Sequence, residues 1–314
     1  MKEPVKYIER ESGKLLNEKI AGEGALRFCY ENMLGKILLE LVVKWPWLSS
    51  LYGMYQDSDA SKRKIKQFIQ DLSIDVNEAE KPINQYANFN EFFARKLKPE
   101  ARPICSQQDR FIMPGDGRVS VIPKICNDRV FQVKGVDFYL SDFLSNNDLA
   151  DKYEGGSLVV VRLCPADYHR FHFPYDGTPG EAQRIAGVLY SVNPIALWQQ
   201  PSLFCENERV LVPFRLLNEQ EILLVDVGAT MVGKIHQTFT PGHSVRKAEE
   251  RGYFTFGAST TVIVFPPNCI VFDEDLIANS IKGIETLCKM GSSLGRCFDN
   301  LQINESSPSS TDDL

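Results

Sequence analysis

Paired cysteines, a basic excess and a long apolar run are all missing from this sequence. None of its eight cysteines forms a C-x-x-C pair, which argues against a zinc ribbon or a compact disulfide framework, so we expect reduced, cytosolic thiols. The net charge of −6 argues against a general nucleic-acid binder. Acidic residues at positions 3, 9, 11 and 18 do not fit a secretory signal or a transit peptide. The 43% of hydrophobic residues are enough for a substantial globular core.

The first hundred residues carry helical patterns. Apolar residues at helical spacing from Leu34 predict an amphipathic helix that ends near Pro46. The same spacing predicts a helix over residues 62–72 and another from about Asn90, whose apolar side includes Leu97. The uncharged stretch within the first of these regions, residues 45–55, is far shorter than the roughly 20 apolar residues that a membrane-spanning helix needs.

The apolar region over residues 28–55 has two interpretations. Either its helix packs on the rest of the protein as ordinary core, or it lies in a bilayer interface with its aromatic residues at headgroup depth. The aromatic residues in question are Trp45, Trp47, Tyr52 and Tyr55. The basic run over residues 61–66 favours the second interpretation, since such a cluster attracts anionic lipid, although it also fits a solvated helix face.

After Pro103 the sequence changes to short β-branched and aromatic runs that are separated by turn residues. This spacing predicts an antiparallel sandwich or barrel-like core rather than βαβ units. The expected fold is therefore α+β, with a helical, membrane-associating region over residues 1–98, a β-rich catalytic domain over 99–303 and a disordered, Ser-rich acidic tail over 304–314. The expected strands include 118–122, 130–133, 157–163, 184–191, 209–214, 222–227, 230–236, 253–256 and 260–265.

Two of the four histidines share a short segment. His169 and His172 lie between Pro165 and Pro174, which bracket them too closely for a metalloprotease helix, so we expect no metal ion. A histidine of this kind is better suited to act as a general base beside a hydroxyl nucleophile, with a carboxylate to orient it. The remaining histidines, His236 and His243, are expected to be structural or surface residues.

The carboxylate and the nucleophile lie in two other segments. Asp116 stands in a P-G-D-G turn, where glycines on both sides allow close backbone approach, although most such strings only form turns. Ser259 follows the small residues Gly257 and Ala258 between two β-type runs, so it can attack the carbonyl of the residue before it. A Gly-Ala pair in a strand pattern more often marks a bulge or close packing.

Several motifs in a fixed order strengthen these assignments. They are N-E-F-F-A-R from Asn90, P-G-D-G around Asp116, D-Y-H-R-x-H-x-P from Asp167, Y-S-V-N-P from Tyr190, N-E-R from Asn207, V-G-A-T-M-V-G from Val227, K-A-E-E-R-G-Y-F from Lys247 and F-G-A-S-T from Phe256. Together they resemble phosphatidylserine decarboxylase, a self-processing pyruvoyl enzyme, over about residues 89–295. The last part of the chain is more similar to the branch whose cleavage motif reads G-G-S-T than to the L-G-S-T branch.

The resemblance implies a mechanism. His169, oriented by Asp116, takes the proton of Ser259, which attacks the carbonyl of Ala258; β-elimination then cuts the chain into 1–258 and 259–314 and leaves a pyruvoyl group derived from Ser259. This covalent pyruvate accepts electrons during the decarboxylation of phosphatidylserine to phosphatidylethanolamine. A proton must be returned by His169 or His172.

The resemblance also implies the partners and location of the protein. Tyr168 and Asn193 are expected headgroup contacts, alongside His172 as proton donor or substrate contact. The two cleavage products are expected to stay together as a heterodimer, bound peripherally to the cytoplasmic side of the cell membrane.

Two departures from the family pattern bear on these expectations. Alanine replaces glycine at Ala258, just before the reactive serine, and at Ala248, where the family usually reads K-G-E-E. At a left-handed backbone position such a Cβ costs about 1–2 kcal/mol. Two other functions stay open: a pyruvoyl-dependent decarboxylase that acts on a soluble amino acid, and a lipid-binding protein that is never processed.

Overall fold

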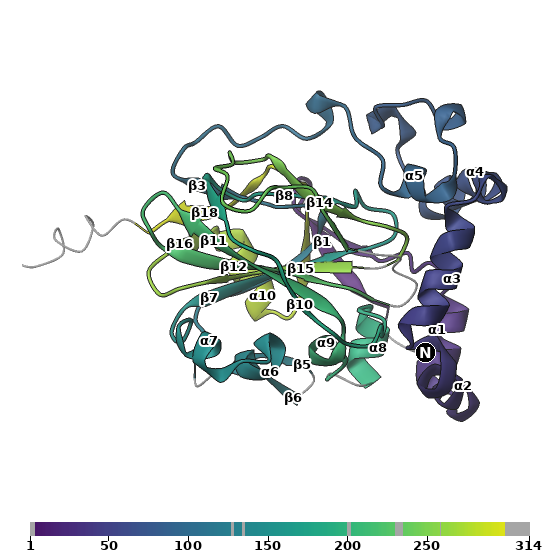
Figure 1. The fold of residues 1–314 in the computed structure, drawn as a ribbon, viewed down its shortest axis with the longest axis horizontal. Coiled ribbons are helices and arrows are strands. Elements are labelled where there is room, and N and C mark those ends of the chain that lie inside the picture. Colours follow the sequence, from purple (N-terminus) through teal and green to yellow (C-terminus); the bar gives the residue numbers. More distant parts are fainter. Residues whose placement is uncertain are drawn as a thin grey trace, which may run out of the picture.

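A large open sheet runs through the centre of the molecule, with helices below it and along one flank (Figure 1). The computed structural model describes residues 4–126, 129–133, 136–199, 202–229, 235–257 and 259–298. In spatial order the ten-stranded sheet contains β10 (Gln183–Ile185), β11 (Arg209–Leu216), β12 (Glu221–Val227), β15 (Ser259–Phe265), β7 (Ser157–Leu163), β4 (Gly117–Ile122), β17 (Glu285–Cys288), β1 (Lys6–Glu9) and β2 (Lys14–Asn17), and β9 (Gly177–Pro179) pairs with β11.

Strand β15 occupies a central position in this sheet. Its run of β-branched residues is buried at every position, as expected for a strand that is covered on both faces. It pairs antiparallel with β7 on one side, where Ser259 is opposite Leu163, and with β12 on the other, where Thr260 is opposite Val227. The first residue of the most buried strand is therefore the predicted nucleophile.

Three smaller sheets complete the β structure. They are β13 (Ile235–Gln237), β14 (Glu250–Phe254) and β8 (Arg170–His172); β16 (Ile270–Phe272), β18 (Ser293–Cys297) and β3 (Arg110–Ile112); and the hairpin of β5 (Arg129–Val133) and β6 (Val136–Tyr139). Among the described strands, only β1 and β17 pair in parallel. The predicted α+β class is confirmed, but the large sheet is open and does not close into a barrel.

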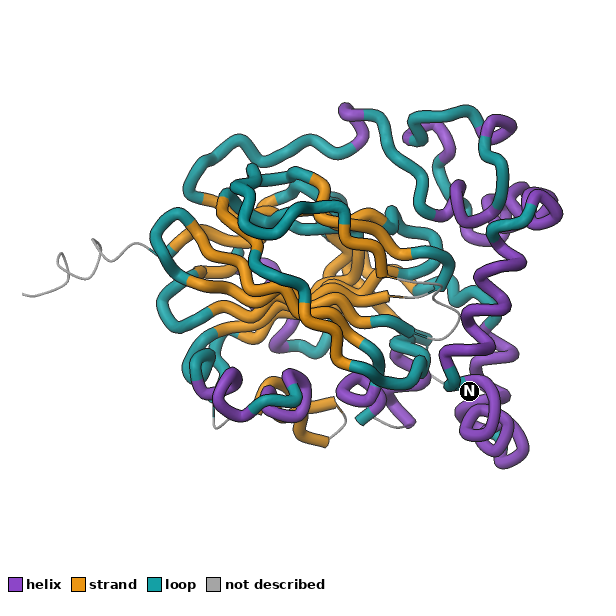
Figure 2. The backbone as a smooth tube through the Cα atoms, viewed as in Figure 1, coloured by secondary structure: helices purple, strands orange, loops and turns teal. Residues whose placement is uncertain are grey.

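The helices gather mainly at the amino-terminal flank and beneath the sheet (Figure 2). Their bounds are α1 (Glu23–Glu31), α2 (Met33–Leu38), the π-helix η1 (Leu39–Val43), α3 (Pro46–Gln56), α4 (Lys64–Leu72), α5 (Phe89–Phe93), α6 (Leu140–Leu144), α7 (Asn147–Asp151), α8 (Pro194–Gln199), α9 (Leu203–Glu206) and α10 (Glu274–Ile281). The predicted helix from Leu34 corresponds to α2 and η1, and α4 confirms most of the helix expected over 62–72. Helix α5 ends at Phe93, so its predicted extension to Leu97 is wrong; Leu97 instead forms a bridge with Ala79.

Some predicted strands differ from the observed ones. The strand expected over 184–191 ends at Ile185, because Val188 forms an isolated parallel bridge with Asn207 and the Leu189 amide donates to the Lys44 carbonyl. Residues 230–234 of another expected strand and the predicted tail over 304–314 lie outside the described residues. The β1–β2 hairpin was not predicted, and it makes the amino-terminal region part of the large sheet.

An aromatic cluster joins the amino-terminal helices to the β structure. Tyr86, Phe89, Phe92 and Phe93 are fully or almost fully buried, and Phe256, which follows β14, packs against this group. A second contact between the two parts is ionic: the buried carboxylate of Glu18 pairs with Arg162 of β7 at 2.6 Å. These two contacts attach the amino-terminal region to the β structure at two points.

Candidate active site

The hydroxyl of Ser259 is enclosed by the sheet. The residue is 0% exposed, and its Oγ has no hydrogen-bond partner among the described residues. Thr260 Oγ1 is buried and without a partner in the same way, while the next hydroxyl, of Thr261, donates to Asp226 at 2.8 Å. A buried hydroxyl without a hydrogen-bond partner lowers the stability of the fold by about 1–3 kcal/mol. Ser259 is therefore a candidate functional residue.

His169 lies in the turn between β7 and β8 and is also fully buried. Its Nδ1 lies 3.0 Å from the carbonyl oxygen of Asp167, so Nδ1 carries the hydrogen and Nε2 the lone pair. Nε2 has no hydrogen-bond partner of ordinary geometry within the described part of the chain, although the backbone of Gly257 is close enough to favour the protonated ring. A proton acceptor therefore lies beside the segment that leads to Ser259.

Burial is the main influence on the pKa of this ring. It lowers the pKa of His169 to about 3, and the positive charge of Arg95 acts in the same direction, while the Asp167 and Gly257 backbones oppose it. At neutral pH the imidazole is uncharged and can accept a proton.

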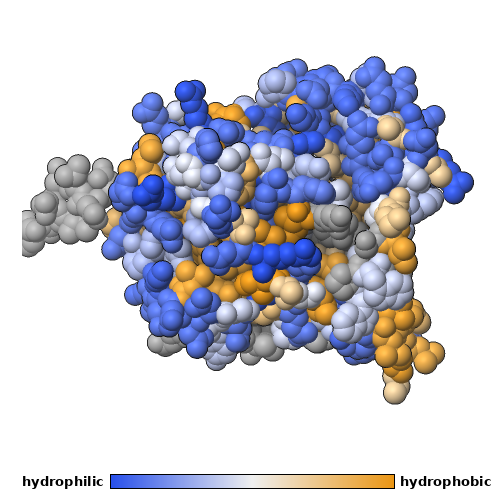
Figure 3. Space-filling model, in the orientation of Figure 1, coloured by the Kyte–Doolittle hydropathy of each residue, from blue (hydrophilic) through white to orange (hydrophobic). Residues whose placement is uncertain are grey.

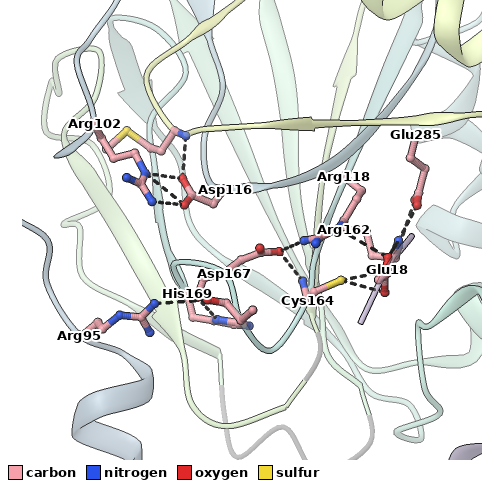
Figure 4. Close-up of polar contacts among 12 residues, drawn as sticks. Glu18, Arg95, Arg102, Asp116, Arg118, Arg162, Cys164, Asp167, His169 and Glu285 are labelled. Carbon is pink, nitrogen blue, oxygen red and sulfur yellow. Dashed lines mark hydrogen bonds and ion pairs between the residues drawn. The ribbon is translucent and has the colours of Figure 1, made fainter. Parts of the chain in front are cut away.

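Asp116 has other partners than the one predicted for it. The Nε–H of Arg102 is shared between its two carboxylate oxygens, at 2.8 and 3.1 Å, and the carboxylate also accepts from Nη2 of Arg102 at 2.5 Å and from the Met290 amide at 2.8 Å (Figure 4). Within the described residues, His169 is oriented by the Asp167 carbonyl instead. The difference has a physical reason: a buried carboxylate needs a cation, and Arg102 supplies it with fork geometry.

Asp167 connects the histidine to a buried network of charges. Its carboxylate accepts from Arg118 and from the Cys164 amide, while its carbonyl holds His169 (Figure 4). Arg118 lies next to Glu18, which also binds Arg162. The ring orientation of His169 is thus tied to the core of the sheet. The D-Y-H-R motif contains Asp167, but nothing in the sequence distinguished its carbonyl as the group that orients the ring.

His172 belongs to a second pair. Its Nδ1 lies 2.9 Å from the Ala248 carbonyl and its Nε2 lies 3.1 Å from the hydroxyl of Tyr168, which therefore donates to it. Burial lowers the pKa of His172, and the charge of Asp116 partly opposes this effect. Burial also raises the pKa of Tyr168 above its usual range, so its phenol keeps its proton. The Tyr168–His172 pair is neutral and holds a transferable hydrogen.

Asn193 and Arg95 have contrasting surroundings. The side-chain oxygen of Asn193 accepts from the Ile195 amide at 3.0 Å, which is the contact of a residue that caps α8. Arg95 was not predicted as a site residue: it is buried, donates to the Ala166 carbonyl at 3.3 Å, and its Nε and Nη1 have no partner among the described residues. Its charge acts on His169.

The family model for phosphatidylserine decarboxylase matches residues 89–296 of this chain. The chain belongs to the phosphatidylserine decarboxylase family. It is similar to the proteins named phosphatidylserine decarboxylase proenzyme in Fusobacterium nucleatum (45% identity over 93% of this chain and 98% of the relative), Clostridium perfringens (44% over 93% and 99%) and Chlamydia trachomatis (40% over 94% and 98%). Membership of this family makes the protein a decarboxylase.

The backbone conformation shows the effect of one of the two departures from the family pattern. Ala248 has a φ of 70°, a left-handed conformation that glycine adopts without strain. Ala258 lies outside the described residues, but its neighbour Gly257 has a φ of 145°, which is accessible only to glycine. The glycine next to the predicted cleavage site is thus required by its own backbone, whereas the alanine at position 248 is strained.

Replacement of Ala248 by glycine is expected to stabilise the fold. It removes a left-handed penalty of about 1–2 kcal/mol and adds about 0.4–1 kcal/mol of unfolded-chain entropy, so the free energy of unfolding should rise by roughly 0.5–1 kcal/mol. Urea unfolding in a Ser259→Ala background measures this change. Ala278→Gly, on an exposed position of α10, is the matched control and should lower the free energy of unfolding by about 1 kcal/mol. A decrease for Ala248→Gly contradicts the strain.

The buried histidines predict acid sensitivity. Because the pKa of His169 is lower in the folded than in the unfolded protein, the unfolded state binds the proton first as the pH falls below about 6.5. The contribution of His169 to the free energy of unfolding is thus fully present above that pH and is lost as the pH falls toward 3. Between pH 7 and 5 this loss amounts to about 2 kcal/mol. Urea unfolding of the Ser259→Ala protein at the two pH values should show this loss. His169→Gln should diminish it, and a loss that persists in full contradicts the assignment, whereas the exposed His243→Gln should leave it unchanged.

Proposed function

We propose that this protein is a self-processing phosphatidylserine decarboxylase, which converts phosphatidylserine to phosphatidylethanolamine with a pyruvoyl group formed from Ser259. One observation carries the proposal: a buried hydroxyl without a partner begins β15, and a buried neutral histidine with a free Nε2 lies beside the residue two positions before it. These are the two groups that cleavage between Ala258 and Ser259 requires, and they fit the formation of a pyruvoyl group in place.

The first stage is the transfer of an acyl group within the chain. Oγ of Ser259 attacks the carbonyl carbon of residue 258 while Nε2 of His169 takes the hydroxyl proton; the peptide C–N bond breaks and an ester replaces it. Removal of the α-proton of residue 259 then breaks the bond between Cβ and Oγ. The carboxylate of residue 258 leaves, and one water molecule is consumed as ammonia departs. Asp116 and its partner Arg102 are proposed to hold the loop that carries residue 290 against this site.

The second stage is decarboxylation. When formed, the pyruvoyl carbonyl supplies an electron sink for the pair left by carbon dioxide. The chain's own residues must then orient the headgroup and return a proton. The neutral Tyr168–His172 pair can supply that proton, since the phenol keeps its hydrogen and the imidazole can replace it. Asn193 is proposed as a further substrate contact through the part of its amide that does not cap α8.

The two products are proposed to stay together. The piece 259–314 contains β15, which pairs with β12 and β7, and β17, which pairs with β4 and β1. All four of these neighbours belong to the piece 1–258, so separation would open two interior positions of the large sheet. A heterodimer of the two cleavage products follows from this topology.

An exposed apolar face supports a peripheral membrane location. Helices α2 and α3 and the segment between them, which includes η1, present large apolar side chains to solvent, and Figure 3 shows such side chains gathered on this protruding part. They are Met33, Leu34, Ile37, Leu38, Leu41, Trp45, Trp47, Leu51 and Met54. In the described part of the chain, no helix is long and apolar enough to cross a membrane.

The charge next to this face fits a lipid surface. The basic run Lys62–Lys66 adjoins α3, and the ammonium of Lys64 lies 4.2 Å from the ring centroid of Tyr55. Cations at the border of an apolar face are typical of helices that lie in a bilayer interface with anionic lipid. All eight cysteines are free thiols, which fits the cytoplasmic side.

Mass spectrometry of the purified protein tests self-processing. The wild-type chain should yield a fragment that ends at Ala258 and a C-terminal fragment with a blocked ketone terminus, whereas Ser259→Ala, His169→Ala and Asp116→Ala should remain at 35.5 kDa. Thr260→Ala removes the adjacent buried hydroxyl and is the matched control, which should still be cut. An uncut wild-type chain contradicts the proposal.

Vesicle sedimentation tests the membrane face. Leu34→Glu with Leu41→Glu removes two side chains that are 71% and 69% exposed, and should weaken binding to phosphatidylserine vesicles at least tenfold because burial of each leucine contributes about 1.5–3 kcal/mol. Leu217→Glu with Ile281→Glu, equally exposed elsewhere, should bind as the wild type does. A wild-type protein that does not sediment contradicts a membrane location and favours a soluble amino acid as substrate.

A further inference from the structure

We propose that Asn90 is a positioning residue for self-cleavage, which holds the main chain just before the scissile bond. Asn90 belongs to α5 and is 4% exposed. Its side-chain oxygen accepts a hydrogen bond from the amide of Phe256 at 3.0 Å, and its side-chain nitrogen donates to the carboxylate of Asp57 at 2.8 Å. The inference rests on the proposed cleavage after residue 258.

The contact fixes the chain very near the reacting atoms. Upstream, the amide of Phe254 donates to the carbonyl of His169 at 3.0 Å; downstream, the strand pairing of β15 begins at Ser259. Between these points the Phe256 amide is bound by Asn90, so only residues 257 and 258 separate it from β15. Gly257 is the conformationally permissive residue of this segment, with its φ of 145°, and therefore benefits most from an external restraint.

The same helix also contacts the proposed base. The ring of Phe93, one turn after Asn90, lies 3.9 Å from the ring of His169, measured between centroids. The ring of Phe256 packs against Phe89 at 5.0 Å and against Phe93 at 5.1 Å. Helix α5 is thus in contact with both the segment that bears the attacked carbonyl and the group that accepts the proton.

Positioning of this kind has a large effect on rate. An intramolecular attack depends on a near-attack geometry, and a misplacement of about 1 Å can reduce the rate on the order of 100-fold. Since the Asn90 amide is neutral and does not reach the hydroxyl proton, its contribution acts through the backbone of Phe256. The carboxylate of Asp57 fixes the rotation of the Asn90 amide, because it can only accept a hydrogen bond and so holds the nitrogen on its own side.

A time course of cleavage in freshly translated protein tests this role. Asn90→Ala should slow cleavage at least tenfold. Asn88→Ala is the matched control: Asn88 also joins α5 to α3, by donating to the Asp57 carbonyl at 3.0 Å, but has no bond to Phe256 among its contacts in the structure. It should slow cleavage less than threefold. Unfolding midpoints of both variants in a Ser259→Ala background report on stability, and an equal slowing of both variants assigns Asn90 a merely structural role and overturns the inference.

A swapped pair provides a second readout. Asn90→Asp keeps an acceptor for the Phe256 amide but opposes two carboxylates, so alone it should cleave slowly. Combined with Asp57→Asn, the donor and acceptor exchange places and cleavage should recover to within threefold of the wild type. No recovery overturns the inference. If the wild-type chain itself remains uncut, the proposed function fails; if it is cut and Asn90→Ala is cut equally fast, only the role of Asn90 fails.

Discussion

Exclusion of water from Ser259 and His169 is the constraint around which the structure is arranged. The strand that begins at Ser259 lies between β12 and β7, and the ring of His169 is covered by Phe93. Burial keeps the imidazole neutral and leaves its Nε2 without a hydrogen bond, and the buried hydroxyl of Ser259 likewise has no partner among the described residues. Two buried polar atoms without partners cost the fold stability, and such a cost is typical of functional sites.

Buried arginine–aspartate pairs define the immediate surroundings. Arg102 holds Asp116, Arg118 holds Asp167, and Arg251 holds Asp226, which also binds the hydroxyl of Thr261. Such pairs contribute little net stability, because the loss of hydration offsets much of their attraction. Their value here is geometric, since each one joins a loop or strand next to the site to a second element of the core.

Much of the fold follows from local sequence pattern, whereas the partners within the site do not. Continuous β-branched runs identify fully buried strands, so the bounds of β7 were predicted residue for residue. Those of β15 were predicted to within one residue, since the strand begins at Ser259 instead of Thr260. The choice of Arg102 as the partner of Asp116 depends on how a loop folds back over the sheet, and the orientation of His169 depends on a main-chain carbonyl that every residue possesses. The parallel pairing of β1 with β17 joins opposite ends of the sequence and has no local signal.

That parallel pairing has a consequence for the history of the molecule. A cut between residues 258 and 259 places β17 and β15 on one polypeptide and both neighbours of each strand on the other. While the chain is continuous, these insertions are intramolecular and independent of concentration. After the cut, a denatured molecule can regain the same interleaved arrangement only through an encounter of two separate polypeptides. If the proposed cut takes place, the uncut chain is the form in which this arrangement assembles without dependence on concentration, and reassembly after the cut becomes bimolecular.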